Sequence, residues 1–350
     1  MNNIAKLTMS AGICGCIFAS CGNGNATSAD DATTPMKVIF ETDMGNDVDD
    51  ALALDMLFKY VEQGDIELLG ISSNKRDEGS MEYLDILTTW YGQPDIPLGY
   101  VENGVPCEDA VNYANAVYSM KASDGTPLFG RSHASDSHMQ PSVTMYRSLL
   151  AQQPDSSVTI ISVGFSTNLA QLLASGPDAA SPLTGKDLVA RKVARLVTMA
   201  GDMAHPGVGE YNVIRDIDAA RKVFAEWPTP VVTSPHEVGA AIEYPASSIE
   251  NDFNWTDAHP VVEAYKAYLP MPYDRPTWDL TSVLYAVEGD GDYFTVSEPG
   301  EILVDSIGAT SFRPSADGNR RYLTVDSGRA ARVLDRFLTL IPRRPQAYGK

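Results

Sequence analysis

Four aspartates cluster near the start of the chain, in a loop between an apolar run at residues 38–40 and a helical pattern at residues 51–58. They are Asp43, Asp47, Asp49 and Asp50. Carboxylates packed this closely repel one another unless protons or a cation lie between them. A hard cation with oxygen ligands, most simply Ca²⁺, is the economical way to hold them together. The loop therefore predicts a calcium site.

A helix cap, an EF-hand or an aspartyl nucleophile would each fit this loop less well. A helix cap needs one acidic side chain such as Asp49, and the helix dipole favours few more, so four aspartates exceed that need. An EF-hand loop beginning at Asp43 would require an oxygen ligand where Gly45 stands and a glycine where Val48 stands. A phosphatase-type aspartyl nucleophile would require a second Asp at position 41, where the longer Glu41 is a poor substitute.

The elements that must hold this loop follow from the periodicity of the chain. Buried strands are predicted at residues 38–40 and 66–73, and helical patterns follow them at residues 51–58 and 80–91. This alternation implies a parallel sheet with right-handed crossovers. Ligands of such sheets bind at the carboxyl ends of the strands, which is where the four aspartates stand.

Later segments complete the expected fold. Further strands are predicted at residues 158–163, 195–200 and 230–233, and helices at residues 142–152, 217–227, 276–286 and 329–341. Alternating apolar and polar residues beyond Gly289 predict a small antiparallel appendage near the C-terminus. We expect an α/β fold in which residues 36–345 form a single domain, with a mostly parallel central sheet flanked by helices.

Polar residues follow the strands predicted at residues 66–73, 158–163 and 195–200, and one stands near the start of the helix at 276–286. They are Asn74, Thr167, Glu210, Asn212 and Asp279. From the residue types alone, Asn74 could form a turn, and Thr167 and Asp279 could cap helices. A ligand site assembled from several strand ends would use the same positions.

The aspartate loop resembles a known signature. Residues 41–51 read ETDMGNDVDDA, which is similar to the DTDxGxDDAxA motif of the inosine–uridine-preferring nucleoside hydrolases. Glu41 replaces the first Asp of that motif, and two residues are inserted between Gly45 and the paired acids. The resemblance implies a Rossmann-like nucleoside hydrolase fold. It also implies Ca²⁺-dependent hydrolysis of ribonucleosides to ribose and free base, in purine and pyrimidine salvage.

The resemblance also implies roles for particular residues. The metal ligands would be Asp43, Asp50, Asp279 and the backbone carbonyl of Thr167. Asp43 would deprotonate a metal-bound water that attacks C1′ of the ribose. The ribose would be held by Asp49, Asn74, Glu210 and Asn212. Asp47, in the insertion, would be either a partner of the ligands or an altered ligand.

Trp278 stands where many family members carry a histidine that assists the departing base. An indole stacks on a base but does not readily protonate it, so leaving-group activation must differ here. The Gly-Asn pair that the family places before its Glu-x-Asn segment is also missing. Two alternatives therefore stay open: a protein that binds nucleosides or sugars without cleaving them, and a hydrolase of another pentoside. Retention of Asp43 favours an enzyme. In that case Asp43→Ala should abolish turnover, whereas Glu41→Ala should reduce turnover only mildly.

Composition excludes some partners. The formal net charge of the 350 residues is −20, which argues against a nucleic-acid ligand and hence against a DNA glycosylase. At 44% hydrophobic residues the chain can bury a sizeable core, and no internal segment is long and apolar enough to span a bilayer. The resemblance adds a homodimer or homotetramer as the expected assembly.

The N-terminus predicts export. Lys6 precedes an apolar stretch at residues 7–18, followed by small residues and Cys21. Residues 1–20 are predicted to be a signal peptide that resembles those of bacterial lipoproteins, with Cys21 acylated and residues 21–35 acting as a flexible spacer. An ordinary cleaved signal is the alternative. The protein would then reside in the periplasm or at the cell surface, and Cys107 alone would leave no intramolecular disulfide.

Overall fold

The strand and helix that flank the aspartate loop form where the sequence predicts them. We describe residues 34–105, 112–132 and 139–346 of a computed structural model, in which β1 (Met36–Thr42) leads through the loop into α1 (Asp49–Gln63). Gly45 turns the loop with φ +105°, a conformation that side chains disfavour. The predicted signal peptide, the spacer up to residue 33 and Cys107 lie outside the described residues.

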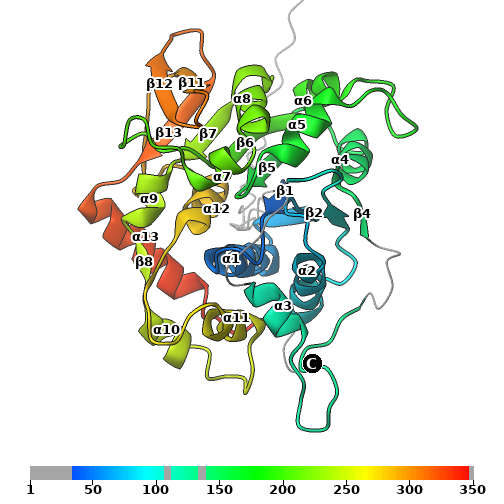
Figure 1. The fold of residues 1–350 in the computed structure, drawn as a ribbon, viewed down its shortest axis with the longest axis vertical. Coiled ribbons are helices and arrows are strands. Elements are labelled where there is room, and N and C mark those ends of the chain that lie inside the picture. Colours follow the sequence, from blue (N-terminus) through cyan, green and yellow to red (C-terminus); the bar gives the residue numbers. More distant parts are fainter. Residues whose placement is uncertain (1–33, 106–111, 133–138, 347–350) are drawn as a thin grey trace, which may run out of the picture. The chain divides into compact units, whose positions relative to one another are not determined.

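A mostly parallel sheet forms the centre of the domain, as expected (Figure 1). Its order through the parallel part is β7-β6-β5-β1-β2-β3-β4. The bounds are β2 (Ile66–Ser73), β3 (Leu98–Tyr100), β4 (Met139–Pro141), β5 (Val158–Ser162), β6 (Val193–Met199) and β7 (Val231–Ser234). The chain builds the sheet outward from β1 on one side, then returns to add β5 on the other. The switch point between β1 and β5 is where open α/β sheets bind ligands at their carboxyl ends.

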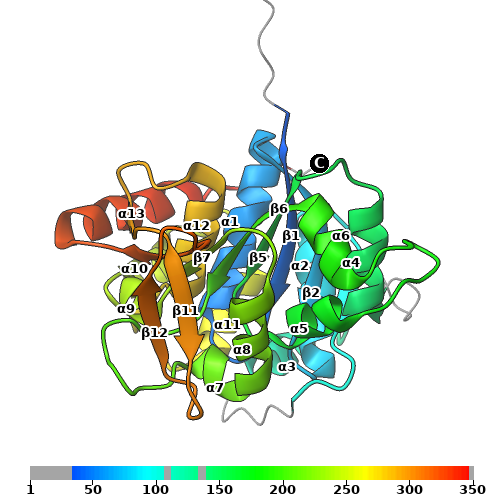
Figure 2. The same cartoon turned by 90° about the horizontal axis from the view of Figure 1, so that it is seen from above.

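Helices cover both faces of the sheet (Figure 2). One apolar cluster gathers α1 with α2 (Glu78–Trp90), α3 (Tyr113–Tyr118), α11 (Pro260–Tyr268), α12 (Trp278–Glu288) and α13 (Ser327–Leu340). The opposite cluster gathers α4 (Ser142–Ala151), α5 (Thr167–Ala174), α6 (Gly185–Lys192) and α8 (Ile217–Glu226). The strands between them are buried on both sides, which explains their nearly continuous apolar runs.

The predicted antiparallel appendage extends the main sheet at one edge. It consists of β10 (Thr295–Val296), β11 (Gly300–Val304), β12 (Thr310–Pro314) and β13 (Arg320–Thr324). β13 joins β7 in parallel, and β11 pairs antiparallel with both β12 and β13. A separate two-stranded sheet joins β8 (Glu243–Tyr244) to β9 (Arg275–Pro276).

Three short helices lie at the ends of parallel strands or in the connection after β7, and the sequence pattern did not predict them. They are α7 (Tyr211–Arg215), α9 (His236–Ala240) and α10 (Ala246–Asn251). Each has only five or six residues, too few for a helical period to show. None of the helices in the described part of the chain is long and apolar enough to cross a membrane.

Candidate active site

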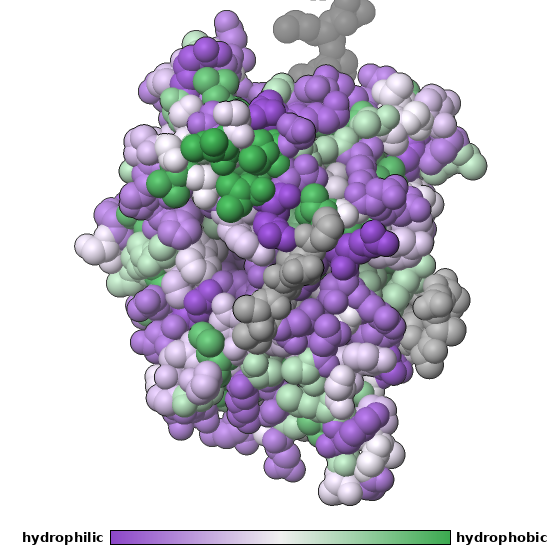
Figure 3. Space-filling model, viewed as in Figure 1, coloured by the Kyte–Doolittle hydropathy of each residue, from purple (hydrophilic) through white to green (hydrophobic). Residues whose placement is uncertain are grey.

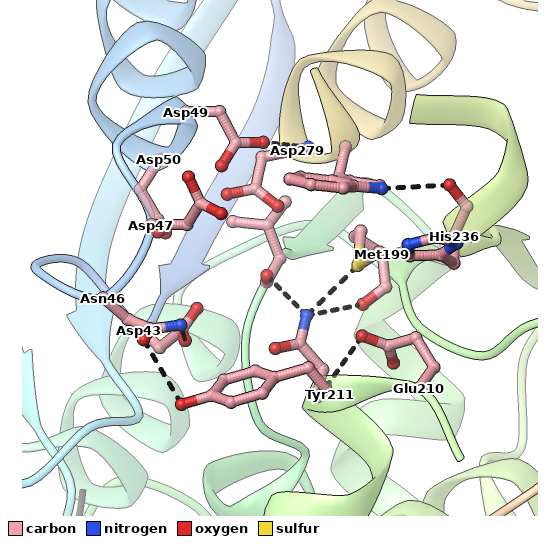
Figure 4. A pocket seen from close by; sticks show the side chains of 13 residues that line it. Asp43, Asn46, Asp47, Asp49, Asp50, Met199, Glu210, Tyr211, His236 and Asp279 are labelled. Carbon is pink, nitrogen blue, oxygen red and sulfur yellow. Dashed lines mark hydrogen bonds between the residues drawn. The ribbon is translucent and has the colours of Figure 1, made fainter. Parts of the chain in front are cut away.

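A pocket of about 310 Å³ opens at the carboxyl ends of the central strands (Figure 4). It is bounded by the loop after β1, the segments after β5 and β6, and the first turns of α1, α7, α9 and α12. The lining residues are Asp43, Asn46, Asp47, Asp49, Asp50, Val163, Met199, Glu210, Tyr211, Asn212, His236, Trp278 and Asp279. Seven residues that the sequence assigns to the site therefore share one pocket: Asp43, Asp49, Asp50, Glu210, Asn212, Trp278 and Asp279.

Three buried carboxylates form the centre of the acidic side. Asp49, Asp50 and Asp279 each offer an oxygen, and these oxygens lie within 4.8 Å of one another. Burial raises the pKa of all three well above the ordinary value, and repulsion from neighbouring aspartates raises it further. Oxygen-only donors under mutual repulsion are the environment that a hard divalent cation relieves, so these residues fit such an ion.

The fold fixes these carboxylates through short polar contacts. Asp49 accepts a hydrogen bond of 3.0 Å from the backbone N–H of Asp279, and so ties the start of α1 to the start of α12. The hydroxyl of Thr42, at the end of β1, donates to Asp50. Both helices direct their N-terminal ends toward the cluster, which favours negative charge there.

Asp43 lies beside these three carboxylates and is closely packed against Gly164. A Cβ on Gly164 would approach the Asp43 carboxylate to 2.7 Å and the side-chain oxygen of Asn74 to 2.6 Å, so only glycine fits there. Asn74 itself does not line the pocket. Its amide donates to Glu41 at 3.0 Å, so Asn74 supports the site through that residue.

Glu41 has a buried structural environment. Its carboxylate accepts hydrogen bonds from Tyr146, Asn74 and Ser162. Burial raises the pKa of Glu41 to about 7, although these hydrogen bonds oppose the shift. Glu41, the longer side chain that replaces the first Asp of the motif, thus reaches a cluster of polar side chains beneath the pocket. Tyr146 of α4 is one of them.

Val163, and not Thr167, lies at the pocket after β5. The Thr167 hydroxyl donates to Asp216 at 2.7 Å, and Thr167 is not a lining residue. Val163 lines the pocket, and its carbonyl accepts a 2.9 Å hydrogen bond from Asn212. Val163 therefore lies at the pocket, whereas Thr167, the ligand that the sequence predicts, lies outside its lining.

Glu210 and Asn212 close the opposite side. Glu210 caps α7 by accepting from the N–H groups of Asn212 at 2.8 Å and Val213 at 3.3 Å, and it also accepts from the N–H of Gly201 at 3.0 Å, just after β6. The Asn212 amide also donates to the Met199 carbonyl at 3.1 Å, so it joins the ends of β5 and β6. Burial raises the pKa of Glu210 to about 7. Both residues face the pocket, and both hold its wall in shape.

Asp47, from the inserted pair, is bound in an ion pair. Its two oxygens accept from the guanidinium of Arg275, with the Nε contact at 2.9 Å. Arg275 lies over the rings of Trp278 at 5.2 Å and Tyr268 at 5.1 Å from guanidinium carbon to ring centroid. The insertion thus brings one more carboxylate to the pocket rim together with the cation that neutralises it.

His236 is a lining residue that the sequence analysis did not identify. It begins α9, and its carbonyl accepts a 3.0 Å hydrogen bond from the Trp278 indole. Gly239 permits this approach, since a Cβ there would lie 2.3 Å from the Trp278 Cα. The one available signal was its place just after a predicted strand, at residues 230–233.

The rim beside α7 is apolar. Figure 3 shows apolar surface grouped on an otherwise largely hydrophilic face. Val208 and Ile214 near α7, and Ile307 from the turn between β11 and β12, are exposed apolar residues, and Ile214 lies close to that turn at Gly308. Tyr211 of the same helix reaches the pocket mouth, where its hydroxyl donates to Asn46 at 3.3 Å.

Comparisons with known proteins agree with this arrangement. A family model described as inosine-uridine preferring nucleoside hydrolase matches residues 38–329. The pyrimidine-specific ribonucleoside hydrolase RihA of Salmonella paratyphi B is 29% identical over 220 residues, which cover 61% of this chain and 65% of that protein. The chain thus matches somewhat less than two thirds of that relative's length.

Solved structures show the same fold. The purine-preferring ribonucleoside hydrolase from Gardnerella vaginalis has a TM-score of 0.66 at 19% identity, and covers 87% of this chain and 98% of its own. The inosine-uridine preferring nucleoside hydrolase from Bacillus anthracis has a TM-score of 0.63 at 19% identity, with 88% and 100% covered. With the match across residues 38–329, this chain belongs to the inosine-uridine preferring nucleoside hydrolase family.

Proposed function

We propose that this protein hydrolyses the N-glycosidic bond of ribonucleosides to ribose and free base, with Ca²⁺ as its cofactor. The observation that carries the proposal is the pocket at the β1–β5 switch point. There Asp43 stands beside three buried carboxylates whose oxygens lie within 4.8 Å of one another. The family match and the RihA relative support this reaction class.

The donor set favours a calcium ion. Asp49, Asp50 and Asp279 offer only oxygen, and Asp43 and the Val163 carbonyl add oxygen nearby. Ca²⁺ takes about six to eight oxygen ligands in flexible geometry, which suits carboxylates from separate elements. When bound, the ion would polarise a water molecule and the ribose hydroxyls.

The chain's own residues supply the remaining chemistry. Asp43 accepts a proton from the attacking water, whose oxygen forms the new bond to C1′. The C1′–N bond breaks through an oxocarbenium-like state, and its electron pair leaves with the base. Asp49, Glu210 and Asn212 orient the ribose, and Trp278 offers the base a ring to stack on.

A release assay tests the proposal. The protein, supplied with Ca²⁺, is incubated with inosine, uridine and p-nitrophenyl riboside, and free ribose is measured. We expect release from at least one nucleoside, and Asp43→Asn should reduce it at least about 1,000-fold because the base is lost. Release at the parent rate by Asp43→Asn would refute the role of Asp43.

A binding protein without turnover is the second candidate. It is favoured by one observation: the side chains of Glu210 and Asn212 are already engaged in hydrogen bonds within the wall of the pocket. Nucleoside binding measured by calorimetry, with no ribose released over days, would identify this case. Release from an arabinoside or a deoxyriboside but not from a ribonucleoside would instead indicate another pentoside.

We also propose that the protein is exported and anchored through Cys21, as a dimer or tetramer. The support is the N-terminal pattern of Lys6, an apolar stretch and Cys21 for the anchor, and the family for the assembly. Cys21→Ser should move the protein from the membrane fraction to the soluble fraction after export. Light scattering of the protein without residues 1–33 measures the assembly.

A further inference from the structure

The departing base requires an acid, and Trp278 cannot serve. The electron pair of the broken C1′–N bond arrives on a base nitrogen, which must be protonated or otherwise stabilised. An indole N–H is a poor acid, and that of Trp278 already donates to the His236 carbonyl at 3.0 Å. Among the described lining residues, His236 is the only histidine.

His236 lies on the correct side of the pocket for this role. In Figure 4 the aspartates occupy one side of the pocket and His236 the other, beyond Met199. Its ring lies 5.5 Å from that of Trp278, centroid to centroid, with the planes inclined by 30°. A ribose held at the aspartates would therefore direct its base toward Trp278 and His236.

A buried carboxylate lies behind the histidine. Nδ1 of His236 is buried and 4.0 Å from a carboxylate oxygen of Asp202, and it has no hydrogen-bond partner within the described part of the chain. Asp202 is 4% exposed and accepts from the backbone N–H groups of Ala204 at 3.0 Å and His205 at 2.9 Å. The Asp202 carboxylate is thus fixed in place, with His236 on one side and the His205 ring, 2.9 Å away, on another.

The groups that face this pair are mostly acidic. Burial disfavours ionisation of Asp202, but hydrogen bonds from His205 and from backbone N–H groups outweigh it and lower the pKa of that carboxyl. Glu237, the next residue, is half-buried and accepts a backbone hydrogen bond from Met203 at 3.3 Å. The facing groups are therefore Asp202, Glu237 and the partly exposed His205, of which two are acidic.

We propose that His236 is the leaving-group acid, with Asp202 as its positioning residue. This inference rests on the proposed hydrolysis. As the C1′–N bond breaks, the electron pair goes to the base nitrogen and takes a proton from His236, while the water proton goes to Asp43. The products are ribose and neutral base, and His236 regains its proton from solvent through its exposed edge, since its side chain is 41% exposed.

Two substrates separate this role from a structural one. Inosine needs a protonated base to leave, whereas p-nitrophenolate leaves from its riboside without a proton. In His236→Gln, kcat for inosine should fall about 100- to 1,000-fold, while kcat for p-nitrophenyl riboside changes less than about threefold. The alkaline limb of the kcat–pH profile for inosine should disappear in the same variant.

Two further variants complete the test. His205→Gln is the matched control, because His205 touches the same Asp202 carboxylate but does not line the pocket, and its kcat for inosine should stay within about threefold. Asp202→Asn should lower kcat for inosine more than it raises KM, again sparing the nitrophenyl substrate. Thermal unfolding checks that each variant folds like the parent.

Each outcome is decisive. Equal losses on both substrates in His236→Gln, or an unchanged kcat for inosine, would overturn the assignment while leaving the hydrolase in place. A parent protein that cleaves the nitrophenyl riboside and inosine equally fast, with no response of inosine to His236→Gln, would also overturn it. A parent that releases ribose from neither substrate would instead remove the hydrolase function, and the acid with it.

Discussion

The ion pair between Asp47 and Arg275 gives a direct test of what the two-residue insertion does. Both side chains are 22% exposed, and the contact is bidentate. Charge-assisted hydrogen bonds of this kind contribute about 1.5–3 kcal/mol, less what the solvent screens. The two ring contacts of Arg275 add about 0.5–1 kcal/mol each. We therefore expect Arg275→Ala to lower the free energy of unfolding by about 2–4 kcal/mol.

A double-mutant cycle isolates the pair itself. Asp47→Ala, Arg275→Ala and the double variant are unfolded with guanidinium chloride in EDTA, so that cation binding does not contribute. We expect a coupling energy of about 1–2 kcal/mol, because each single variant leaves one charge without its partner. Arg313 and Glu301 form the matched control: this pair is also charge-assisted but 63% and 44% exposed, so its coupling should be about 0.2–1 kcal/mol.

The reasoning fails if the Asp47–Arg275 coupling is no larger than that of the control pair. In that case Asp47 would contribute through the cation site alone. A Ca²⁺ titration of Arg275→Ala tests whether Asp47 acts at the cation site. Removing the guanidinium leaves the Asp47 charge near Asp49 without its partner, which should tighten Ca²⁺ binding.

Four other predictions concern the cation, two buried acids and a glycine. Ca²⁺ at 100 times its Kd should raise the free energy of unfolding by about 2.7 kcal/mol over EDTA in thermal or chemical melts, and Asp279→Asn should abolish that gain. Glu41→Ala, which the sequence predicts to affect turnover only mildly, should lower the free energy of unfolding by about 2–4 kcal/mol, because three donors lose a buried acceptor. Glu41→Gln should lower it less in the same denaturation experiment. Burial raises the pKa of Asp55 in the folded state to about 7 despite Lys59, whereas the pKa in the unfolded chain is about 4. Asp55 therefore lowers the free energy of unfolding progressively as the pH rises from about 4 to 7. In Asp55→Asn this loss is removed, so the free energy of unfolding should fall less, or rise more, between about pH 4 and 7 than it does in the parent. Gly164→Ala should reduce turnover, measured as ribose release, by displacing the Asp43 backbone that a Cβ would meet at 2.7 Å.

The parallel sheet and the acidic loop could be predicted because each is encoded locally. Residues 38–40 and 158–163 are largely apolar runs, which indicate strands buried on both faces of a sheet. Helices between the strands show a clear helical period of apolar residues. Helix α9, which the sequence does not predict, has five residues, as has strand β12 of the appendage. They gain their stability from neighbours such as β11 and Trp278, which no local pattern reveals.

Val163 lies at the pocket and Thr167 outside its lining for a geometric reason. In the parallel pairing of β1 with β5, Glu41 lies opposite Ser162, and the Val163 N–H donates to the Glu41 carbonyl at 2.8 Å. The residues just after these two strands therefore leave the sheet side by side, which places Val163 close to Asp43. Thr167 lies one turn further on, where α5 has already begun. Counting from the strand end predicts Val163 as the residue at the pocket, whereas matching a short polar motif predicts Thr167.

The charges at the pocket indicate what kind of ion it could hold. Five aspartates line it, namely Asp43, Asp47, Asp49, Asp50 and Asp279, and Arg275 neutralises one of them. The N-terminal ends of α1 and α12 each add about half a positive charge. A monovalent cation would leave more than one uncompensated negative charge in a buried site, whereas a divalent ion leaves close to one. That remaining charge is what Asp43 needs to act as a base, so a chain with this pocket should select Ca²⁺ over Na⁺.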